Sequence, residues 1–556
     1  MNERFARQFK KRSHLITGLI FLLSVSSISH FFFSWMGFNP TDDGFILAGS
    51  RRILEGQIPH LDFISIRPIG SYLLHVPFVF FGGDYTFWIS RYFVWFQFAC
   101  IAWLWTIIID RLLETRFTSV ERILYAVVAF GLSSHNFAIL AWHSVDALFL
   151  SSIALALCVR CSQHVKMMGY LLIGLAPLCR QNFLLMIPVS IILVSDWRKI
   201  RYWLIAIMPG LFVGIYLLVI GAFPDALLQM GSQTDIMNFG VKIYIRKWSV
   251  PLGILLGYWA MYLSFGKIKL APLVKRISIQ RLLGGLFLFG VPLGAAIALS
   301  QDRYIGIPCF GLFGTAAGAT MYFIMELQER FRRARAGILV LVTAWSVSIS
   351  VGYNTPALGA GFLTIFIIAC SRISYQSTDI KSWMKKLPIL LTTVLVIVTL
   401  FSYGIARQEY IYRDLPAHDL THSLDGVFPG GSLIRTNPNT HAFLADLQLA
   451  IDRIQGLDFC ILPDLAGYWV KSPRTNPLSI DWVQGTELNT QPLVNRVIRD
   501  LKIHRGNIIV IVQKVLASSL PNGFIPLPDD DYYRVVQYVR MNFMKIEETE
   551  FFDLYK

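Results

Sequence analysis

The stretch NPTDDGFILAGSRRILEGQIPHLDFISIRPIGSYLLHVPFVFFGGD, residues 39 to 84, lies between two long apolar segments and decides how the rest of the chain is interpreted. Leu, Ile and Phe recur along it at helical spacing, which predicts amphipathic helices lying along a membrane surface. Charges gathered where a membrane protein could avoid them indicate a functional site. The charged residues of interest in this stretch are Asp42, Asp43, Arg51, Arg52, Asp62 and Arg67.

The composition places the chain among helical membrane proteins. It has 556 residues, of which 54% are hydrophobic, and its mean hydropathy of +0.53 is too apolar for a soluble protein. Apolar runs of about 18 or more residues recur, and each is long enough to cross about 30 Å of hydrocarbon as a helix. These runs predict an all-α polytopic domain over residues 1–406, with about 13 transmembrane or re-entrant helices.

The net charge of +15 is distributed in a way that favours membrane orientation over nucleic-acid binding. Alternate loops are rich in Lys and Arg, and the loops between them carry few. This positive-inside pattern predicts a cytoplasmic N-terminus and, after an odd number of spans, a C-terminal segment outside the cytoplasm. The basic clusters are Arg4–Arg12, Arg111–Arg122, Arg160–Lys166, Arg198–Arg201, Lys267–Arg281, Arg330–Arg335 and Arg372–Lys386.

Residues 407–556 differ in composition from the rest and predict a small extracytoplasmic α/β domain. The segments GSLIRT and NIIVIVQ are typical of strands, whereas HAFLADLQLAIDRIQ and PLVNRVIRDLK have helical periodicity. An exported domain without an N-glycosylation acceptor sequence indicates a bacterial envelope. We therefore expect a multi-pass protein of the bacterial inner membrane.

The acid pair Asp42 and Asp43 allows two compatible interpretations. One carboxylate can act as a general base, with the other orienting it or raising its pKa. Alternatively, Thr41 or Asp42 caps the helix that begins near Phe45, where acids suit the helix dipole.

An interrupted apolar segment, Gly169 to Val194, carries Arg180, Gln181 and Asn182 in its middle. About 26 residues cannot form two full spans, yet both flanking loops are basic. We predict two short helices with the polar residues at a bend that faces a cavity. A charge in this place indicates substrate binding, and a structural ion pair or carbonyl clamp is the alternative.

Other charged positions also have two interpretations each. Arg67, ahead of a proline, could bind a substrate phosphate in a bidentate contact, whereas Arg51 and Arg52 suit lipid phosphates. The loop at 222–249 could hold an anionic head group or simply be solvated; its candidates are Lys242, Tyr244 and Arg246. Asp146, at an outer turn, is a cap or a second acid.

The order of residues in 39–84 resembles the first external loop of GT-C-type membrane glycosyltransferases, the superfamily of bacterial protein mannosyltransferases and aminoarabinose transferases. The Arg-Gln pair in GLAPLCRQN and the segment SPRTNPLSID in the tail are similar to further features of that family. The family most often has Asp-Glu at the acid pair, where this chain has Asp-Asp. The residues that carry the likeness are Asp42, Asp43, Gly44, Ala48, Arg52, Gly56, Pro59, Asp62, Phe63, Pro68 and Gly70.

The resemblance implies a GT-C-like fold and a polyprenyl-phosphate sugar donor, with transfer on the outer face of the membrane and inversion at the anomeric carbon. Asp42 inherits the role of base, Asp43 stays a close competitor, and Asp62 is expected at the substrate. A glycan, lipid or protein of the envelope would be the acceptor. The sequence indicates no cofactor and leaves the need for a divalent metal open.

A transporter or flippase of lipid-linked glycans or solutes is the rival interpretation. It should show broken helices at corresponding places in two halves of the chain. Only the segment at 169–194 is interrupted. His418 and His422 have the spacing of metal ligands on a helix, but no third ligand is evident, so we predict no metal site.

Overall fold

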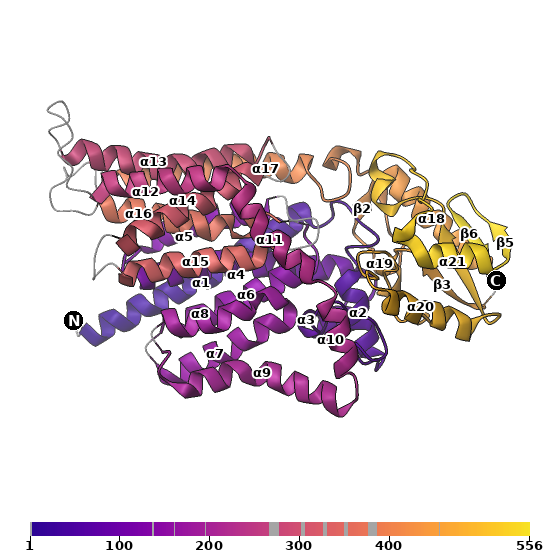
Figure 1. The fold of residues 1–556 in the computed structure, drawn as a ribbon. Helices are drawn as coiled ribbons and strands as arrows, with labels where there is room; N and C mark the ends of the chain where they lie inside the picture. The colour runs from indigo at the N-terminus through magenta and orange to yellow at the C-terminus, as the bar shows by residue number, and fades with distance from the viewer. Residues whose placement is uncertain are drawn as a thin grey trace.

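The computed structural model describes residues 3–135, 138–160, 162–194, 196–265, 277–301, 306–325, 331–349, 354–375, 386–454 and 456–556. A helical bundle holds the N-terminus at one end, and a small sheet domain with the C-terminus lies at the other (Figure 1). Most of the basic cluster predicted at Lys267–Arg281 lies outside the described residues.

The described part of the chain contains seven helices long and apolar enough to cross a membrane, or eight if a pair bent by 62° counts as one span. The protein is thus a helical membrane protein, but the predicted count of about 13 spans is not confirmed. α5 and α6 show why, because their 16 residues each extend only about 24 Å. The bundle helices are α1 (Glu3–Phe33), α4 (Thr86–Leu113), α5 (Ser119–Ser134), α6 (His143–Cys158), α7 (Gln163–Cys179), α8 (Met186–Leu193), α9 (Ile200–Val219), α12 (Ser249–Phe265), α13 (Ile277–Ala298), α14 (Gly306–Met325), α15 (Phe331–Ser348), α16 (Ala360–Tyr375) and α17 (Leu387–Glu409).

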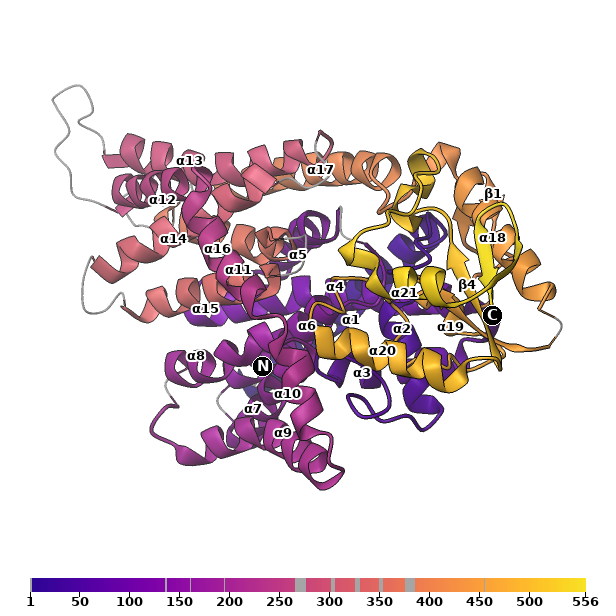
Figure 2. The same ribbon diagram turned by 45° about the vertical axis from the view of Figure 1, so that its right-hand side comes forward.

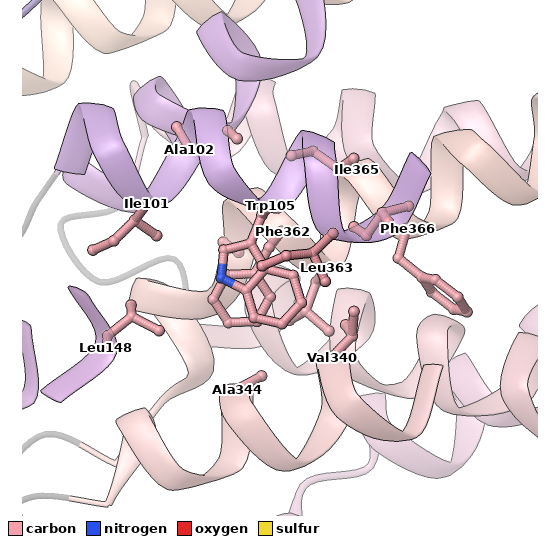
Figure 3. Packing of buried hydrophobic residues seen from close by; sticks show 14 of the residues in the cluster. Ile101, Ala102, Trp105, Leu148, Val340, Ala344, Phe362, Leu363, Ile365 and Phe366 are labelled. Carbon is pink, nitrogen blue, oxygen red and sulfur yellow. The ribbon is translucent and has the colours of Figure 1, made fainter. Parts of the chain in front are cut away.

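The centre of the bundle is packed around the indole of Trp105 on α4 (Figure 3). Its ring stacks on Phe362 of α16 with the centroids 4.4 Å apart. The indole N–H donates to Ser152 Oγ at 3.0 Å, so burial leaves this polar group satisfied. Val340 and Ala344 of α15 lie near these rings, so α4 shares one core with two helices more than two hundred residues further along the chain.

The interruption predicted in the apolar segment at 169–194 is confirmed. α7 ends at Cys179, and Arg180 is extended, with φ −149° and ψ 121°. A 3₁₀ turn, η2 (Gln181–Leu185), then leads into α8. Residue 180 therefore sits at a bend between two helices, where its backbone leaves the helical path.

Both helices predicted in the first loop are present, as α2 (Phe45–Leu54) and α3 (Gly70–Phe81). The predicted cap of α2 is wrong. The residue before the helix is Gly44, and no side chain bonds the first turn, because Asp42 and Asp43 are engaged elsewhere. The loop predicted at 222–249 forms α10 (Phe223–Gly231) and α11 (Thr234–Arg246).

The C-terminal domain has a four-stranded sheet in the order β3-β4-β6-β5. β3 and β4 are parallel, and β6 is antiparallel to both β4 and β5. The prediction is confirmed for NIIVIVQ, which contains β4, and for the two helices, whereas only the last two residues of GSLIRT are strand. The elements are η6 (Ala417–Asp419), β1 (His422–Ser423), β2 (Arg435–Thr436), α18 (Pro438–Asp452), β3 (Asp458–Leu462), α19 (Ala466–Trp469), α20 (Gln491–His504), β4 (Ile508–Gln513), η7 (Ala517–Asn522), η8 (Asp531–Tyr533), α21 (Arg534–Asn542), β5 (Lys545–Glu548) and β6 (Phe552–Tyr555).

The first loop and the C-terminal domain share one hydrophobic core. Ile46 and Leu47 of α2 belong to the same buried cluster as Phe459 of β3, and Figures 1 and 2 show this domain against α2. The backbones touch at Gly44, where an added Cβ would lie 2.1 Å from the Cα of Gly467. Only glycine permits such an approach, so the acid pair lies directly beneath the sheet domain.

Candidate functional site

Asp43 is a structural carboxylate that shapes the start of the first loop. Its Oδ1 accepts a hydrogen bond from Arg91 of α4 at 2.8 Å, and its Oδ2 accepts from the backbone N–H of Asn39 at 2.9 Å. Arg91 also donates to the carbonyls of Ser34 and Gly37, each at 2.7 Å. Burial raises the pKa of Asp43 despite the nearby guanidinium. Both oxygens are therefore occupied in holding the loop.

Asp42 points instead toward the segment that enters the C-terminal domain. Its Oδ2 accepts a hydrogen bond from the Tyr412 hydroxyl at 2.8 Å and pairs with Arg413 at 3.0 Å. The carboxylate is 1% exposed, whereas the arginine side chain is 38% exposed. Arg413 therefore connects the buried carboxylate of Asp42 with the solvent-exposed surface of the junction.

Asp464 brings a second carboxylate to Asp42 from the C-terminal domain. It follows β3 by two residues, at the carboxyl end of the parallel strand pair, where α/β sheets commonly place ligand sites. The hydroxyl of Thr41 donates to its backbone carbonyl at 2.8 Å, which ties the two segments together. Its Oδ1 is buried and has no hydrogen-bond partner within the described residues.

The environment of Asp464 changes its ionisation. The pKa of Asp464 is raised to about 7. Burial is the largest cause, the positive charge of Arg413 opposes it, and the negative charge of Asp42 adds to it. Gln484 donates to Oδ2 at 3.3 Å, which favours the charged form only weakly. A carboxyl that titrates near neutral pH is suited to proton transfer.

A third acid, Glu487, lies between the predicted arginines. Its Oε1 accepts a hydrogen bond from Arg67 at 3.0 Å, and both side chains are buried. Burial raises the pKa of Glu487, the charges of Arg67 and Arg180 lower it, and that of Asp42 raises it. Arg180 donates to the carbonyl of Ile349 at 2.9 Å, as a carbonyl clamp would, while its Nε has no partner within the described residues.

Aromatic rings border these charges. Phe45 contacts Trp482 edge to face, with centroids 5.0 Å apart, and the guanidinium of Arg67 lies 4.8 Å from the Phe45 centroid. Phe45 and Trp482 are half-buried. The indole N–H of Trp482 has no hydrogen-bond partner within the described part of the chain. Flat rings beside unpartnered polar atoms are typical of sites that bind small polar ligands.

Gln181 and Asp62 both form hydrogen bonds with the backbone of the first loop. Gln181 donates to the carbonyl of Ile66 at 3.2 Å, next to Arg67. Asp62 is exposed and accepts a hydrogen bond from the backbone N–H of Ile58 at 2.7 Å, so it closes a turn of the first loop. The structure gives Asp62 no contact with Asp42, Asp464 or Glu487 among the described interactions.

The remaining predicted residues lie apart from the acid cluster. Asp146 is fully buried and accepts from His75 at 3.0 Å and Gln97 at 2.8 Å. Tyr244 is buried and shares a hydrogen bond with Ser348, so it packs into the bundle. Lys242 and Arg246 are exposed on α11, on the opposite side of that helix from the buried tyrosine.

The expectation that Arg52 contacts lipid phosphate is wrong. Its guanidinium is buried and donates to both carboxylate oxygens of Asp481, each at 2.7 Å. It also donates to the carbonyl of Leu478 at 2.8 Å. Arg51 pairs with Glu55 at 2.8 Å and is partly exposed. Arg52 therefore fastens the first loop to the C-terminal domain.

Sequence reasoning missed three partners that the C-terminal domain contributes, namely Arg413, Asp464 and Glu487. It singled out the segment SPRTNPLSID, which ends in Asp481, but gave that residue no role. The position of Asp464 could have been predicted, because the apolar run FCIL followed by Pro-Asp is typical of a buried strand that ends in a loop. Arg413 and Glu487 lie in irregular segments without periodicity. Among the described residues no group of three or more His, Cys, Asp and Glu could hold a metal ion.

Comparison with family models, curated proteins and solved structures finds no match to this chain. The chemistry must therefore be inferred from the junction itself: two neighbouring carboxylates, one titrating near neutral pH, with arginines and half-buried aromatic rings around them.

Proposed function

We propose that this membrane protein is an inverting glycosyltransferase that moves a sugar from a polyprenyl-phosphate donor to an envelope glycan, lipid or protein. One observation carries the proposal: Asp42 lies buried beside Asp464, where the first loop meets the C-terminal domain. The resemblance of residues 39–84 to GT-C-type enzymes supports the same site. In this proposal the junction faces away from the cytoplasm of a bacterial cell, in agreement with the distribution of basic residues.

The reaction is a single displacement. The acceptor hydroxyl oxygen forms a bond to the anomeric carbon of the sugar while the bond from that carbon to the phosphate oxygen breaks. The proton of the hydroxyl passes to Asp42, and the electron pair of the broken bond leaves with the polyprenyl phosphate. Ionised Asp464 makes Asp42 more basic through the repulsion between two like charges.

The developing charge on the phosphate needs positive partners. Arg413 is the half-exposed cation at Asp42, and arginine binds phosphate oxygens in a bidentate manner. Arg67 already pairs with Glu487 and Arg180 with a carbonyl, so these two arginines hold the neighbouring segments in place and keep positive charge close to the acid cluster. Lys242 and Arg246, exposed on α11, lie apart from the acid cluster and are candidates for the outer part of the donor head group.

The lipid part of the donor explains why such an enzyme resides in a membrane. Exposed apolar side chains cover α9, such as Leu204, Leu211 and Phe212. A polyprenyl chain can lie along such helices while its phosphate reaches the junction at the end of the bundle. The donor would then approach from the membrane and the acceptor from the aqueous side.

The proposal is tested by the release of free polyprenyl phosphate. Purified protein receives a panel of polyprenyl-phosphate sugars and crude envelope acceptor, and Asp42→Asn is compared with the surface variant Asp529→Asn. We expect release from one donor, with Asp42→Asn inactive and Asp529→Asn at the wild-type rate. Release unaffected by Asp42→Asn would remove the chemistry from this site, and no release from any donor would favour a transporter.

The pH dependence gives a second readout. Because the pKa of Asp464 is about 7, the wild-type rate should rise as the pH passes through that value, as Asp464 ionises. Asp464→Asn cannot ionise, and its profile should lose this step. A wild-type profile that is flat around neutral pH would contradict the role given to Asp464.

A further inference from the structure

A basic hollow of about 650 Å³ lies at the end of the bundle that carries the N-terminus, far from the acid cluster. It is formed by the ends of α4, α6 and α8 and the beginnings of α7 and α15. Two acids, Asp110 and Glu114, also line it. Its cationic residues come from three separate segments of the chain and are Arg111, Arg116, Arg160, Lys166, Arg332 and Arg335.

Part of this positive charge is neutralised within the protein. Glu114 pairs with Arg332 at 3.0 Å, and Lys166 pairs with Asp196 at 2.7 Å. The carboxylate of Asp110 pairs at 2.8 Å with Arg122, which is outside the lining.

Four lining arginines remain, Arg335 among them. Arg111, Arg116 and Arg160 form no ion pair within the part of the chain that the structure describes. All three are exposed. The hollow therefore concentrates unneutralised guanidinium groups.

Membrane topology alone does not explain this convergence. Basic residues at one side of a membrane orient a protein wherever they occur in the short loops. Gathering them around one hollow adds like-charge repulsion, which a bound anion would remove. The lining also includes apolar residues, among them Leu112 and Leu193, so the hollow offers hydrocarbon contact beside its cations.

We propose that this hollow binds a phosphate group, carried by a membrane lipid head group or by a soluble phosphate compound. Its volume is in the range of pockets that enclose small ligands. Arginine is the side chain best suited to phosphate oxygens, because its planar guanidinium donates two parallel hydrogen bonds. The site is independent of the acid cluster, since the two lie at opposite ends of the bundle (Figure 1).

The experiment compares two matched double variants in micelles that contain equal amounts of phosphatidylglycerol and phosphatidylcholine. Arg111→Gln with Arg160→Gln removes two cations of the hollow. Arg198→Gln with Lys386→Gln removes two exposed cations that do not line it. Native mass spectrometry measures the phosphatidylglycerol retained, and the melting temperature in phosphate against chloride at equal ionic strength measures soluble phosphate.

We expect wild type to retain phosphatidylglycerol in preference to phosphatidylcholine, and the hollow variant to bind it about 30-fold more weakly, from two lost charges near a membrane surface. The matched control and a charge-keeping variant, Arg111→Lys with Arg160→Lys, should stay near wild type. A melting shift in phosphate without retained lipid would assign the hollow to a soluble phosphate compound. Equal losses in both double variants, or no preference in wild type in either assay, would overturn the proposal.

Discussion

The two ends of this protein use arginine in opposite ways. At the junction with the C-terminal domain, Arg52, Arg67 and Arg91 are buried and each pairs with a carboxylate. At the other end, Arg111 and Arg160 are exposed and form no ion pair within the described residues. Burial explains the difference, because an arginine removed from water requires a partner, whereas an exposed one does not.

The role of a charged residue therefore cannot be inferred from its local sequence alone. Arg52 and Arg111 both lie close to apolar segments and both suit a lipid phosphate by pattern alone. The partner of Arg52, Asp481, lies more than four hundred residues away in the sequence. The same arginine that a local pattern assigns to lipid therefore holds two parts of the chain together.

Removing Arg91 should give the largest effect. Arg91→Ala leaves Asp43 buried without its partner and should cost about 3–5 kcal/mol of stability. Thermal unfolding in detergent measures the loss, with Arg111→Ala as the matched change at the opposite end, where less than about 0.5 kcal/mol is expected. Adding Asp43→Asn to Arg91→Ala should recover part of the loss. Equal effects of Arg91→Ala and Arg111→Ala would erase the distinction between the two ends.

Asp464 should make stability depend on pH. Its folded-state pKa, raised to about 7, lies above that of the unfolded chain, so the folded state binds more protons in between. Wild type should therefore lose stability as the pH rises from about 4 to about 7, relative to Asp464→Asn. The advantage of the Asn variant should grow by about 2 kcal/mol between about pH 5 and pH 7 and level off above pH 7.

Thermal unfolding of wild type and Asp464→Asn across this pH range tests whether the stability of wild type falls relative to the variant as the pH rises. Asp529→Asn, at an exposed carboxylate, serves as the control and should show no such trend. An advantage of Asp464→Asn that shrinks with rising pH would mean that Asp464 is held in its charged form.

The smallest effect is expected at the basic hollow. In lipid-free detergent at low salt, Arg111→Gln with Arg160→Gln should stabilise the protein slightly, by less than about 1 kcal/mol, since it removes like-charge repulsion between exposed groups. Added salt should abolish the gain because it screens exposed charges. A destabilised double variant would show that these arginines have structural partners.

The local features of the fold were predictable from the sequence. Helical periodicity in 39–84 predicted α2 and α3, and the polar interruption predicted the break at Arg180. The number of spans was not predictable, because α5 and α6 are apolar yet too short to cross about 30 Å, and their ends are set by packing against neighbours rather than by composition.

The sequence indicated the candidate site residues of the first loop but not their partners in the C-terminal domain. The sequence indicated Asp42 and Asp43 as candidates but could not separate their roles, because Arg91 contacts Asp43 from α4 and Arg413 contacts Asp42 from the start of the C-terminal domain. The cap assigned to Asp42 failed for the same reason. Tertiary partners, absent from any local pattern, decided the role of each carboxylate.

The most direct test of the account is the turnover of Asp42→Asn at saturating donor, compared with wild type and Asp529→Asn. A general base contributes about 10²–10⁴-fold to a rate, so kcat should fall by that range while KM for the donor changes less than about three-fold and the melting curve stays close to wild type. A folded Asp42→Asn protein with wild-type kcat would contradict the assignment of catalysis to this junction.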